Sequence, residues 1–185
     1  MRSLARVAVV AIWIVWAYPY LFRAPKIQRR ESLTVGGPSL LGLLLETAAI
    51  FMVWIFRVPG GWRENPAVLA AALALGVTGD VLMWTAITHL GRQFRIQAGL
   101  YHDHELVRSG PYSLLRHPIY AGLLAVMLAT GLLQAPWPWV LVALTVFMAG
   151  TEIRVRTEDR LLASRFGAEF AEYKKTVPAY LPFVR

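Results

Sequence analysis

Long apolar runs separated by short polar segments make up most of this 185-residue chain. The runs lie near residues 4–22, 38–57, 67–90, 119–134 and 137–153. A helix needs roughly 20 mostly apolar residues to cross a hydrocarbon core of about 30 Å, so the first three runs are long enough and the last two are shorter. The pattern predicts an all-α integral membrane protein with about five transmembrane helices, folded as a single membrane-embedded domain over residues 1–185.

The composition supports this class of protein. Hydrophobic residues make up 57% of the chain, charged residues only 16%, and the mean hydropathy is +0.49, whereas soluble domains average about 25% charged residues. The bilayer is therefore the first expected partner. The chain has no cysteine, which excludes disulfides, thiolate catalysis and cysteine-based zinc sites.

The net charge of +8 does not indicate nucleic acid as a partner, because the basic residues lie between the apolar runs and not along one helical face. Their distribution instead predicts topology. With the N-terminus outside, most of the 19 Lys and Arg residues fall on the inner side, as the positive-inside rule requires. We therefore expect a multi-pass protein with its C-terminus in the cytoplasm.

Two polar segments face the cytoplasm in this topology, and both are long enough to carry function. The first is the connection 90–118. The second is the tail 154–185, in which Leu162, Phe166 and Phe170 recur every four residues. This spacing predicts an amphipathic extension of the fifth helix, weakened at Gly167. Together the two segments are expected to form a cytoplasmic cofactor site.

Several polar residues lie where these segments meet the apolar runs. His117 precedes Pro118 at the start of the fourth run, as expected of a helix N-terminus. Arg154 and Glu158 are four residues apart and share one helix face. From spacing alone, a ligand site and an ordinary helix start are equally good interpretations of His117. A surface ion pair is the plain interpretation of Arg154 and Glu158, but their position at the end of the fifth span favours a polar ligand.

Acidic residues within the spans are candidates of another kind. Glu46 and Asp80 lie inside the second and third apolar runs, where a carboxylate is costly and is often functional; each also fits a hydrogen bond to a neighbouring helix. His102, Asp103 and His104 suggest a metal cluster, but an H-x-H pattern without further ligands is weak. We predict no metal site.

Short motifs in the C-terminal half occur in a characteristic order. They are Leu90-Gly91-Arg92, Gln97, His104-x-Leu106-Val107, Ser109-Gly110-Pro111-Tyr112, Arg116-His117-Pro118-Ile119-Tyr120-x-Gly122, Arg154-x-x-x-Glu158, Phe166-Gly167-x-Glu169-Phe170-x-Glu172-Tyr173-Lys174-Lys175, Val177-Pro178 and Leu181-Pro182-Phe183. This ordered set resembles the isoprenylcysteine carboxyl methyltransferase family, within the integral-membrane methyltransferases that include phospholipid methyltransferases. Residues 1–89 match only as hydrophobic spans.

The resemblance implies a methyltransferase that binds S-adenosylmethionine at the cytoplasmic membrane face. By resemblance, Arg154 binds the substrate and acts in catalysis with Glu158. The implied cofactor-binding residues are Gln97, His104, Glu105, Leu106, Val107, Tyr112, His117, Pro118, Ile119, Tyr120 and Glu158. This assignment is physically coherent, because tyrosine faces attract a sulfonium cation and backbone N–H groups at the His117–Pro118 helix start suit its carboxylate.

The expected reaction is methylation of the carboxylate of a lipid-like substrate such as a C-terminal isoprenylcysteine. Arg154 favours an anionic acceptor, because guanidinium pairs with carboxylate in a bidentate manner. A phospholipid or small-lipophile N- or S-methyltransferase is the alternative, since the same arginine also suits a phosphate. A noncatalytic transporter with Glu46 and Asp80 as its polar pathway is the alternative from another class.

Overall fold

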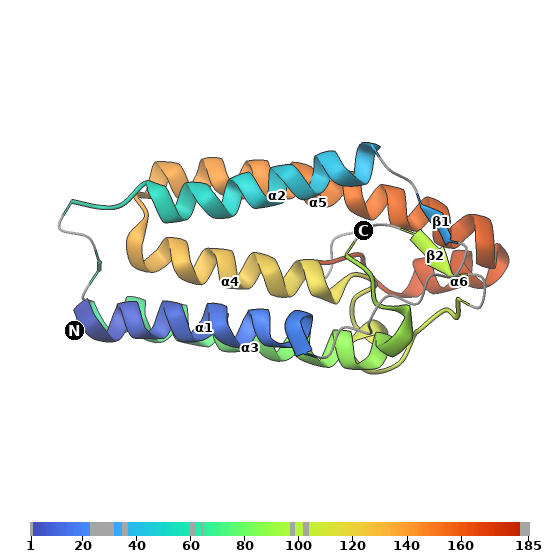
Figure 1. Ribbon diagram of the computed structural model, residues 1–185, viewed down its shortest axis with the longest axis horizontal. Coiled ribbons are helices and arrows are strands. Elements are labelled where there is room, and N and C mark those ends of the chain that lie inside the picture. The colour runs from blue at the N-terminus through green and yellow to red at the C-terminus, as the bar shows by residue number, and fades with distance from the viewer. Residues whose placement is uncertain are drawn as a thin grey trace.

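Five long helices lie side by side along the length of the protein, and the smaller elements gather at one end (Figure 1). The computed structural model describes residues 2–22, 32–34, 37–59, 62–63, 65–96, 99–101 and 104–181. The helices are α1 (Arg2–Phe22), α2 (Gly37–Ile55), α3 (Pro66–Leu90), α4 (Pro118–Gln134), α5 (Trp137–Phe166) and α6 (Ala168–Thr176). Two 3-10 turns, η1 (Gly91–Gln93) and η2 (Gly110–Ser113), and two short strands, β1 (Ser32–Thr34) and β2 (Gly99–Tyr101), complete the described elements.

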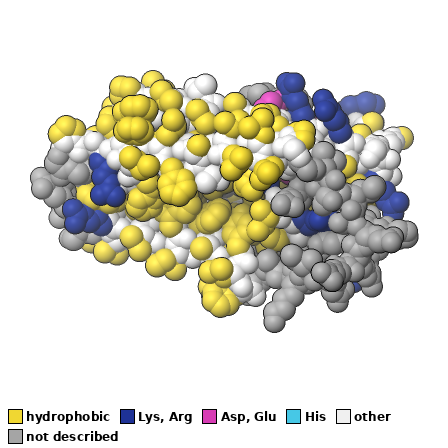
Figure 2. Space-filling view, turned by 45° about the horizontal axis from the view of Figure 1, so that its top comes forward, with side chains coloured by type: hydrophobic (Ala, Val, Ile, Leu, Met, Phe, Trp, Pro, Cys, Tyr) yellow, Lys and Arg dark blue, Asp and Glu magenta, His cyan; other side chains and the backbone are white. Residues whose placement is uncertain are grey.

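The helices confirm the predicted all-α membrane fold. Four of them, α1, α2, α3 with η1, and α5, are long and apolar enough to cross a membrane. Large apolar side chains such as Leu44, Phe51, Val77 and Leu141 remain exposed on them, and apolar side chains gather over the left and middle of the view in Figure 2. This outward apolar surface is what a lipid environment requires.

α4 differs from the other long helices in length and burial. Its 17 residues extend about 26 Å at 1.5 Å per residue, slightly less than a bilayer core. Most of its side chains are buried, because the helix is apolar on all sides and packs among its neighbours. The predicted short span near 119–134 is therefore the inner helix of the bundle.

The fifth helix continues well beyond the predicted span 137–153. α5 has 30 residues, or about 45 Å, and its last turns extend beyond the bundle toward the end where α6 and the strands lie (Figure 1). Gly167, with φ of 51°, separates α5 from α6. The expected helical extension and its interruption at Gly167 are both confirmed.

Two pairs of helices approach closely at glycines. In α2 and α5, a Cβ atom at Gly42 would lie 2.7 Å from the Gly150 carbonyl oxygen. In α3 and α4, a Cβ atom at Gly79 would lie 2.6 Å from the Gly122 carbonyl oxygen. Because any side chain would separate these backbones, the glycines set the spacing of both pairs, as small residues do in membrane helix packing.

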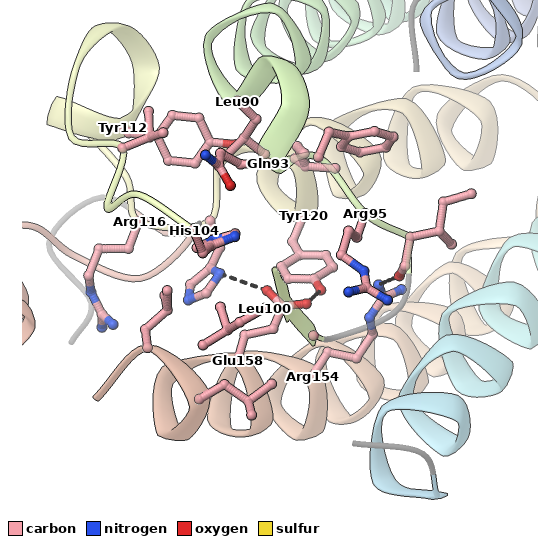
Figure 3. A pocket seen from close by; sticks show the side chains of 18 of the residues that line it. Leu90, Gln93, Arg95, Leu100, His104, Tyr112, Arg116, Tyr120, Arg154 and Glu158 are labelled. Carbon is pink, nitrogen blue, oxygen red and sulfur yellow. Dashed lines mark hydrogen bonds and ion pairs between the residues drawn. The ribbon is translucent and has the colours of Figure 1, made fainter. Parts of the chain in front are cut away.

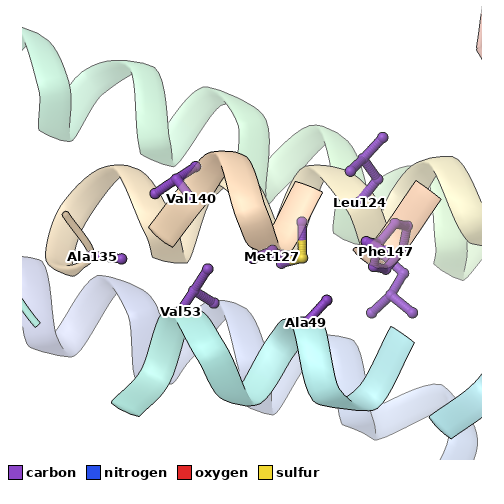
Figure 4. Close-up of a cluster of buried hydrophobic side chains, with 9 residues drawn as sticks. Ala49, Val53, Leu124, Met127, Ala135, Val140 and Phe147 are labelled. Atoms are coloured by element: carbon purple, nitrogen blue, oxygen red, sulfur yellow. The ribbon is translucent and has the colours of Figure 1, made fainter. Parts of the chain in front are cut away.

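Apolar side chains from α2, α4 and α5 fill the space between these helices (Figure 4). Val53, Met127 and Phe147 are fully buried there. Polar contacts add specificity at the edges: Trp13 Nε1 of α1 donates to Thr130 Oγ1 of α4 at 2.9 Å, and Gln134 Nε2 donates to the Val53 carbonyl at 3.1 Å. Such bonds replace water, which the hydrocarbon does not supply.

The connection 90–118 is built of short elements instead of a plain loop. It contains η1, β2 and η2, and β2 pairs antiparallel with β1, with Leu33 opposite Leu100. The strand pair was not predicted. It joins a segment that precedes α2 to one that follows α3, and so gathers distant parts of the chain at the same end as α6 (Figure 1).

Candidate functional site

A cavity of about 450 Å³ lies at this end of the bundle, within the size range of small-molecule sites. Its walls come from the last turns of α1 and α3, the connection 90–118, the start of α4, the outer half of α5, and α6. In Figure 3 the labelled side chains Tyr120, Glu158 and Arg154 lie together on one side of this space, and Tyr112 and Gln93 on another. Segments distant in sequence thus converge on one site.

His117 lies between two carboxylates of α5. Its Nε2 is 3.0 Å from Asp159 Oδ1 and its Nδ1 is 3.2 Å from Glu158 Oε2. The side chain is buried, and burial alone would lower its pKa, but hydrogen bonds to Asp159 and Glu158 outweigh this and raise the pKa above its ordinary value. The protonated ring can donate to both carboxylates at once, so His117 fixes the Glu158 side chain in the cavity wall.

Asp159 connects the start of α4 to the tail. Arg116 Nη1 lies 2.6 Å from both of its carboxylate oxygens, and Lys174 Nζ lies 3.1 Å from Oδ2. Arg116 also donates through Nε to the Val177 carbonyl at 3.0 Å. These bonds hold α5, α6 and the start of α4 in one arrangement behind the cavity.

Tyr120 contacts both Glu158 and Arg154, which lie about one turn apart on α5. The Tyr120 hydroxyl donates a hydrogen bond to Glu158 Oε1, and Arg154 Cζ lies 4.9 Å from the centroid of the Tyr120 ring. Both carboxylate oxygens of Glu158 are therefore engaged, and one face of Tyr120 is already covered by a cation. Cation–π attraction of a sulfonium is therefore limited to the face of the Tyr120 ring that Arg154 does not cover.

Arg154 is bound from two sides. Its Nη1 is 2.9 Å from Glu46 Oε2 in α2, and its Nη2 donates to the Ile96 carbonyl at 2.6 Å. Its Nε is buried and has no hydrogen-bond partner among the described residues. The expected surface ion pair is thus not what forms, because Arg154 is buried and pairs with an intramembrane carboxylate on another helix.

Two buried tyrosines complete the far wall. The Tyr173 hydroxyl of α6 donates to the Tyr112 carbonyl at 2.5 Å. Burial and the nearby Glu158 carboxylate raise the pKa of Tyr112 well above its ordinary value, and burial raises the pKa of Tyr173 to about 12. Both hydroxyls are therefore neutral donors at physiological pH.

The structure brings most of the predicted site residues to this cavity. The lining includes His104, Glu105, Leu106, Val107, Tyr112, His117, Ile119, Tyr120, Arg154 and Glu158. Gln97 lies outside the described residues, as do His102 and Asp103. Pro118 is the first residue of α4 and is not part of the lining described for the cavity.

Two backbone N–H groups at the start of α4 already have partners. The His117 backbone N–H, expected to be free for a carboxylate, donates to the Ala179 carbonyl at 2.7 Å, and the Arg116 N–H donates to the Pro178 carbonyl at 2.9 Å. The tail therefore uses these donors itself. Pro118 has no N–H to offer, so neither His117 nor Pro118 presents a free backbone N–H to an anion.

Sequence reasoning missed several residues of the site. Asp159 was overlooked, although it follows Glu158 directly and a second acidic residue at the end of a span is itself a signal. Tyr20, Gln93, Arg95 and Leu100 also line the cavity, and no spacing rule links them to it. Among the described residues, no group of three His, Asp or Glu side chains could hold a metal ion.

Asp80 lies apart from this site. It lines a second cavity of about 370 Å³ formed by α1 and α3, whose walls are almost entirely apolar, such as Ala11, Ile12, Val77 and Val81. Its side chain is 6% exposed, and Oδ1 has no hydrogen-bond partner among the described residues. Glu46 and Asp80 thus occupy different helix pairs.

Fold and site define a multi-pass membrane protein with a ligand-sized cavity at one end of its helix bundle. The chain belongs to the isoprenylcysteine carboxyl methyltransferase (ICMT) family, whose model matches residues 72–164. The match begins within α3 and ends within α5, so it includes the connection 90–118, the start of α4, and both Arg154 and Glu158.

The individual relatives include two protein-S-isoprenylcysteine O-methyltransferases and one protein named for metal resistance. The chain is 37% identical over 126 residues to the "Cobalt-zinc-cadmium resistance protein CzcN" of Cupriavidus metallidurans, over 68% of this chain and 54% of that protein. It is 33% identical over 127 residues to "Protein-S-isoprenylcysteine O-methyltransferase B" of Arabidopsis thaliana, over 67% and 64% of the two chains. It is 34% identical over 119 residues to the rat "Protein-S-isoprenylcysteine O-methyltransferase", over 63% and 42%.

The fold is also similar to a solved structure. With a TM-score of 0.60 and 20% sequence identity, the chain resembles the "eukaryotic intramembrane Ras methyltransferase ICMT", covering 95% of this chain and 63% of that one. The chain thus spans between 42% and 64% of the length of these four proteins. The likeness to the solved structure supports the intramembrane helical fold described above.

Proposed function

We propose that this protein is an S-adenosylmethionine-dependent methyltransferase that acts on the carboxylate of a lipid-like substrate such as a C-terminal isoprenylcysteine. The observation that carries the proposal is the convergence of Tyr120, Glu158 and Arg154 in one cavity that faces the end of a membrane bundle. The cavity combines acidic and aromatic groups with a buried arginine, and so suits a cationic methyl donor beside an anionic acceptor.

The donor side of the cavity is formed by Glu158 and the tyrosines. When bound, S-adenosylmethionine supplies a methyl group activated by a sulfonium charge. The carboxylate of Glu158, held by His117 and Tyr120, provides negative charge for such a cation, and Tyr112 provides aromatic surface nearby. The His104–Val107 segment lines the same cavity and is proposed to contact the rest of the cofactor.

The acceptor side is formed by Arg154. A C-terminal carboxyl group with a pKa of about 3.5 is already ionised at neutral pH and needs no general base. Arg154 lines the cavity, and a guanidinium group suits a charge-assisted hydrogen bond to a carboxylate oxygen. Holding the acceptor in the right orientation then accounts for much of the catalysis.

We also propose that the site faces the cytoplasm. Basic residues of the connection 90–118 and of α6 lie at the cavity end, and the first residues of α1 lie at the opposite end (Figure 1). The positive-inside rule places the more basic end in the cytoplasm. A lipid-modified substrate would then reach the cavity from the bilayer around the helices.

Two alternatives remain open to experiment. The pairing of Arg154 with Glu46 leaves less positive charge for an anionic acceptor, which favours a phospholipid or small-lipophile N- or S-methyltransferase as the second candidate. A transporter with a polar path through Glu46 and Asp80 is less well supported, because Glu46 lies between α2 and α5 whereas Asp80 lies beside α1.

Calorimetric binding of S-adenosylmethionine to the detergent-purified protein tests the cofactor. We expect saturable binding that weakens at least about tenfold in Glu158→Gln, the cost of roughly 1.4 kcal/mol of lost interaction. Glu172→Gln is the matched control, because Glu172 is exposed in α6 and pairs with Lys175. No binding to a well-folded wild-type protein would overturn the proposed function.

Methyl transfer to N-acetyl-S-farnesylcysteine tests the acceptor. A methyl ester is base-labile and an N-methyl group is not, so radioactive methanol released by base identifies carboxyl methylation. Arg154→Ala should reduce turnover about 100-fold or more, whereas Arg156→Ala, an exposed arginine two residues away, should not. Methyl transfer to phosphatidylethanolamine instead would show that the acceptor is a phospholipid, and it would leave the proposed cofactor site unchanged.

A further inference from the structure

Glu46 is the most deeply buried acidic side chain of the described residues, at 1% exposure. It lies in α2, outside the segment that matches the family model. Both of its carboxylate oxygens are engaged by α5: Thr151 Oγ1 donates to Oε1 at 2.9 Å, and Arg154 Nη1 donates to Oε2 at 2.9 Å. A charge buried this completely in a membrane bundle is retained where it has a specific role.

α2 also makes room for the arginine itself. A Cβ atom at Gly42 would lie 2.5 Å from Arg154 Cγ and 2.7 Å from the Gly150 carbonyl oxygen. Gly42 and Glu46 are four residues apart and share one face of α2. The first leaves space for the aliphatic part of Arg154, and the second binds its guanidinium.

The other contacts of Arg154 come from the cavity side. Its Nη2 donates to the Ile96 carbonyl, and its guanidinium lies over the Tyr120 ring. Arg154 and Tyr120 line the cavity, whereas Gly42 and Glu46 are not part of that lining. Glu46 therefore contacts Arg154 directly, and it acts on a molecule in the cavity through Arg154 and not by its own contact.

We propose that Glu46 is a positioning residue for methyl transfer: its carboxylate holds the Arg154 guanidinium at the cavity wall in the orientation that binds the acceptor. This inference rests on the proposed function. It follows that Glu46 controls the binding and orientation of the acceptor, and that it has little effect on the affinity for S-adenosylmethionine, which is assigned to Glu158 and its neighbours.

A double-mutant cycle on methyl transfer separates positioning from general stability. Glu46→Gln keeps the size of the side chain and removes its charge. We expect it to reduce kcat/KM for the acceptor about 10- to 100-fold, with less than a twofold change in the Kd for S-adenosylmethionine. In an Arg154→Ala background the same change should have no further effect. Equal losses in both backgrounds, or a parallel loss of cofactor affinity, would overturn the proposal.

Two further variants guard against a loss of folding. Glu46→Asp keeps the charge and should recover part of the lost activity, which general destabilisation would not predict. Thr47→Val is the matched control, because Thr47 is exposed in α2 and its hydroxyl donates to the Leu43 carbonyl of its own helix. It should match the wild type in kcat/KM.

A chemical readout keeps this inference distinct from the proposed function. Phenylglyoxal modifies free guanidinium groups, and mass spectrometry follows its rate at Arg154 with the exposed Arg156 as internal reference. We expect modification several-fold faster in Glu46→Gln than in the wild type. Equal rates would show that Glu46 does not hold Arg154, whether or not methyl transfer is observed. A wild-type protein without cofactor affinity would refute the proposed function, and faster modification in Glu46→Gln would then still show that Glu46 holds Arg154.

Discussion

Glu46 of α2 and Asp80 of α3 are acidic side chains buried in membrane-length helices, and their surroundings differ. Glu46 is hydrogen-bonded through both oxygens to Thr151 and Arg154. Asp80 faces an almost entirely apolar groove between α1 and α3, and its buried Oδ1 has no hydrogen-bond partner among the described residues. Hydropathy marks both residues equally, and only the contacts between helices distinguish the paired Glu46 from Asp80.

The strongest test of this difference is the loss of Glu46. Glu46→Ala should reduce the free energy of unfolding by about 3–5 kcal/mol, because it leaves the buried Arg154 without its ionic partner. Unfolding in mixed detergent micelles measures the change. Thr47→Ala, at an exposed neighbouring position, should cost less than about 1 kcal/mol. Equal losses in the two variants would refute the importance of the ion pair.

The close spacing of α2 and α5 gives a second way to disrupt the Glu46–Arg154 ion pair. Gly150→Ala should destabilise the protein by about 1–3 kcal/mol, because its Cβ would lie 2.7 Å from the Gly42 carbonyl oxygen and force the helices apart. Gly37→Ala is the control, since nothing lies within 4 Å of a Cβ there. The same unfolding titration applies, and a Gly150 variant as stable as the control would contradict the close packing.

The pH dependence of folding stability tests the ion pairs that His117 makes with Glu158 and Asp159. Because the folded protein raises the His117 pKa, its ion pairs contribute fully below the ordinary pKa of about 6.5 and are lost as pH rises through the folded-state value. The thermal midpoint of the wild type should exceed that of His117→Gln at pH 6, and the gap should narrow toward pH 9. Each unit of pKa difference corresponds to about 1.4 kcal/mol.

The shape of the pH trend distinguishes the ion pairs of His117 from its packing. A gap between wild type and His117→Gln that stays constant from pH 6 to pH 9 would show that the ring contributes through packing alone.

Asp80 should give the smallest effect, of opposite sign. Asp80→Leu should stabilise the protein by up to about 1 kcal/mol, because it removes a buried oxygen that lacks a hydrogen bond and adds apolar surface to an apolar groove. The change is measured as a rise in the unfolding midpoint. A loss of more than about 1 kcal/mol would mean that Asp80 has a partner of its own and would remove the contrast with Glu46.

Most of the fold was predictable, because membrane spans are determined by length and hydropathy. The bounds of α1, α3 and α4 differ from the predicted spans by one or two residues. The strand pair was not predictable, since β1 and β2 are three residues each and their pairing depends on segments that only the folded bundle brings together. The glycine contacts also depend on which helices are neighbours, which hydropathy does not specify.

The site was predictable where residue order carried the information. The family motifs indicated Tyr112, His117, Tyr120 and the Arg154–Glu158 pair, and the structure gathers these residues at one cavity. It was not predictable where the partner lies far away in sequence. Arg154 is separated by 108 residues from Glu46, and no local pattern indicates which of two intramembrane carboxylates faces it.

That separation also affects how the protein is made. α2 is synthesised long before α5, so Glu46 enters the membrane while its counter-ion does not yet exist. At 5–20 residues per second, the 108 residues between them correspond to a wait of roughly 5 to 20 s. During this interval the translocon and the nascent helices must tolerate a carboxyl group in α2 that has not yet met Arg154.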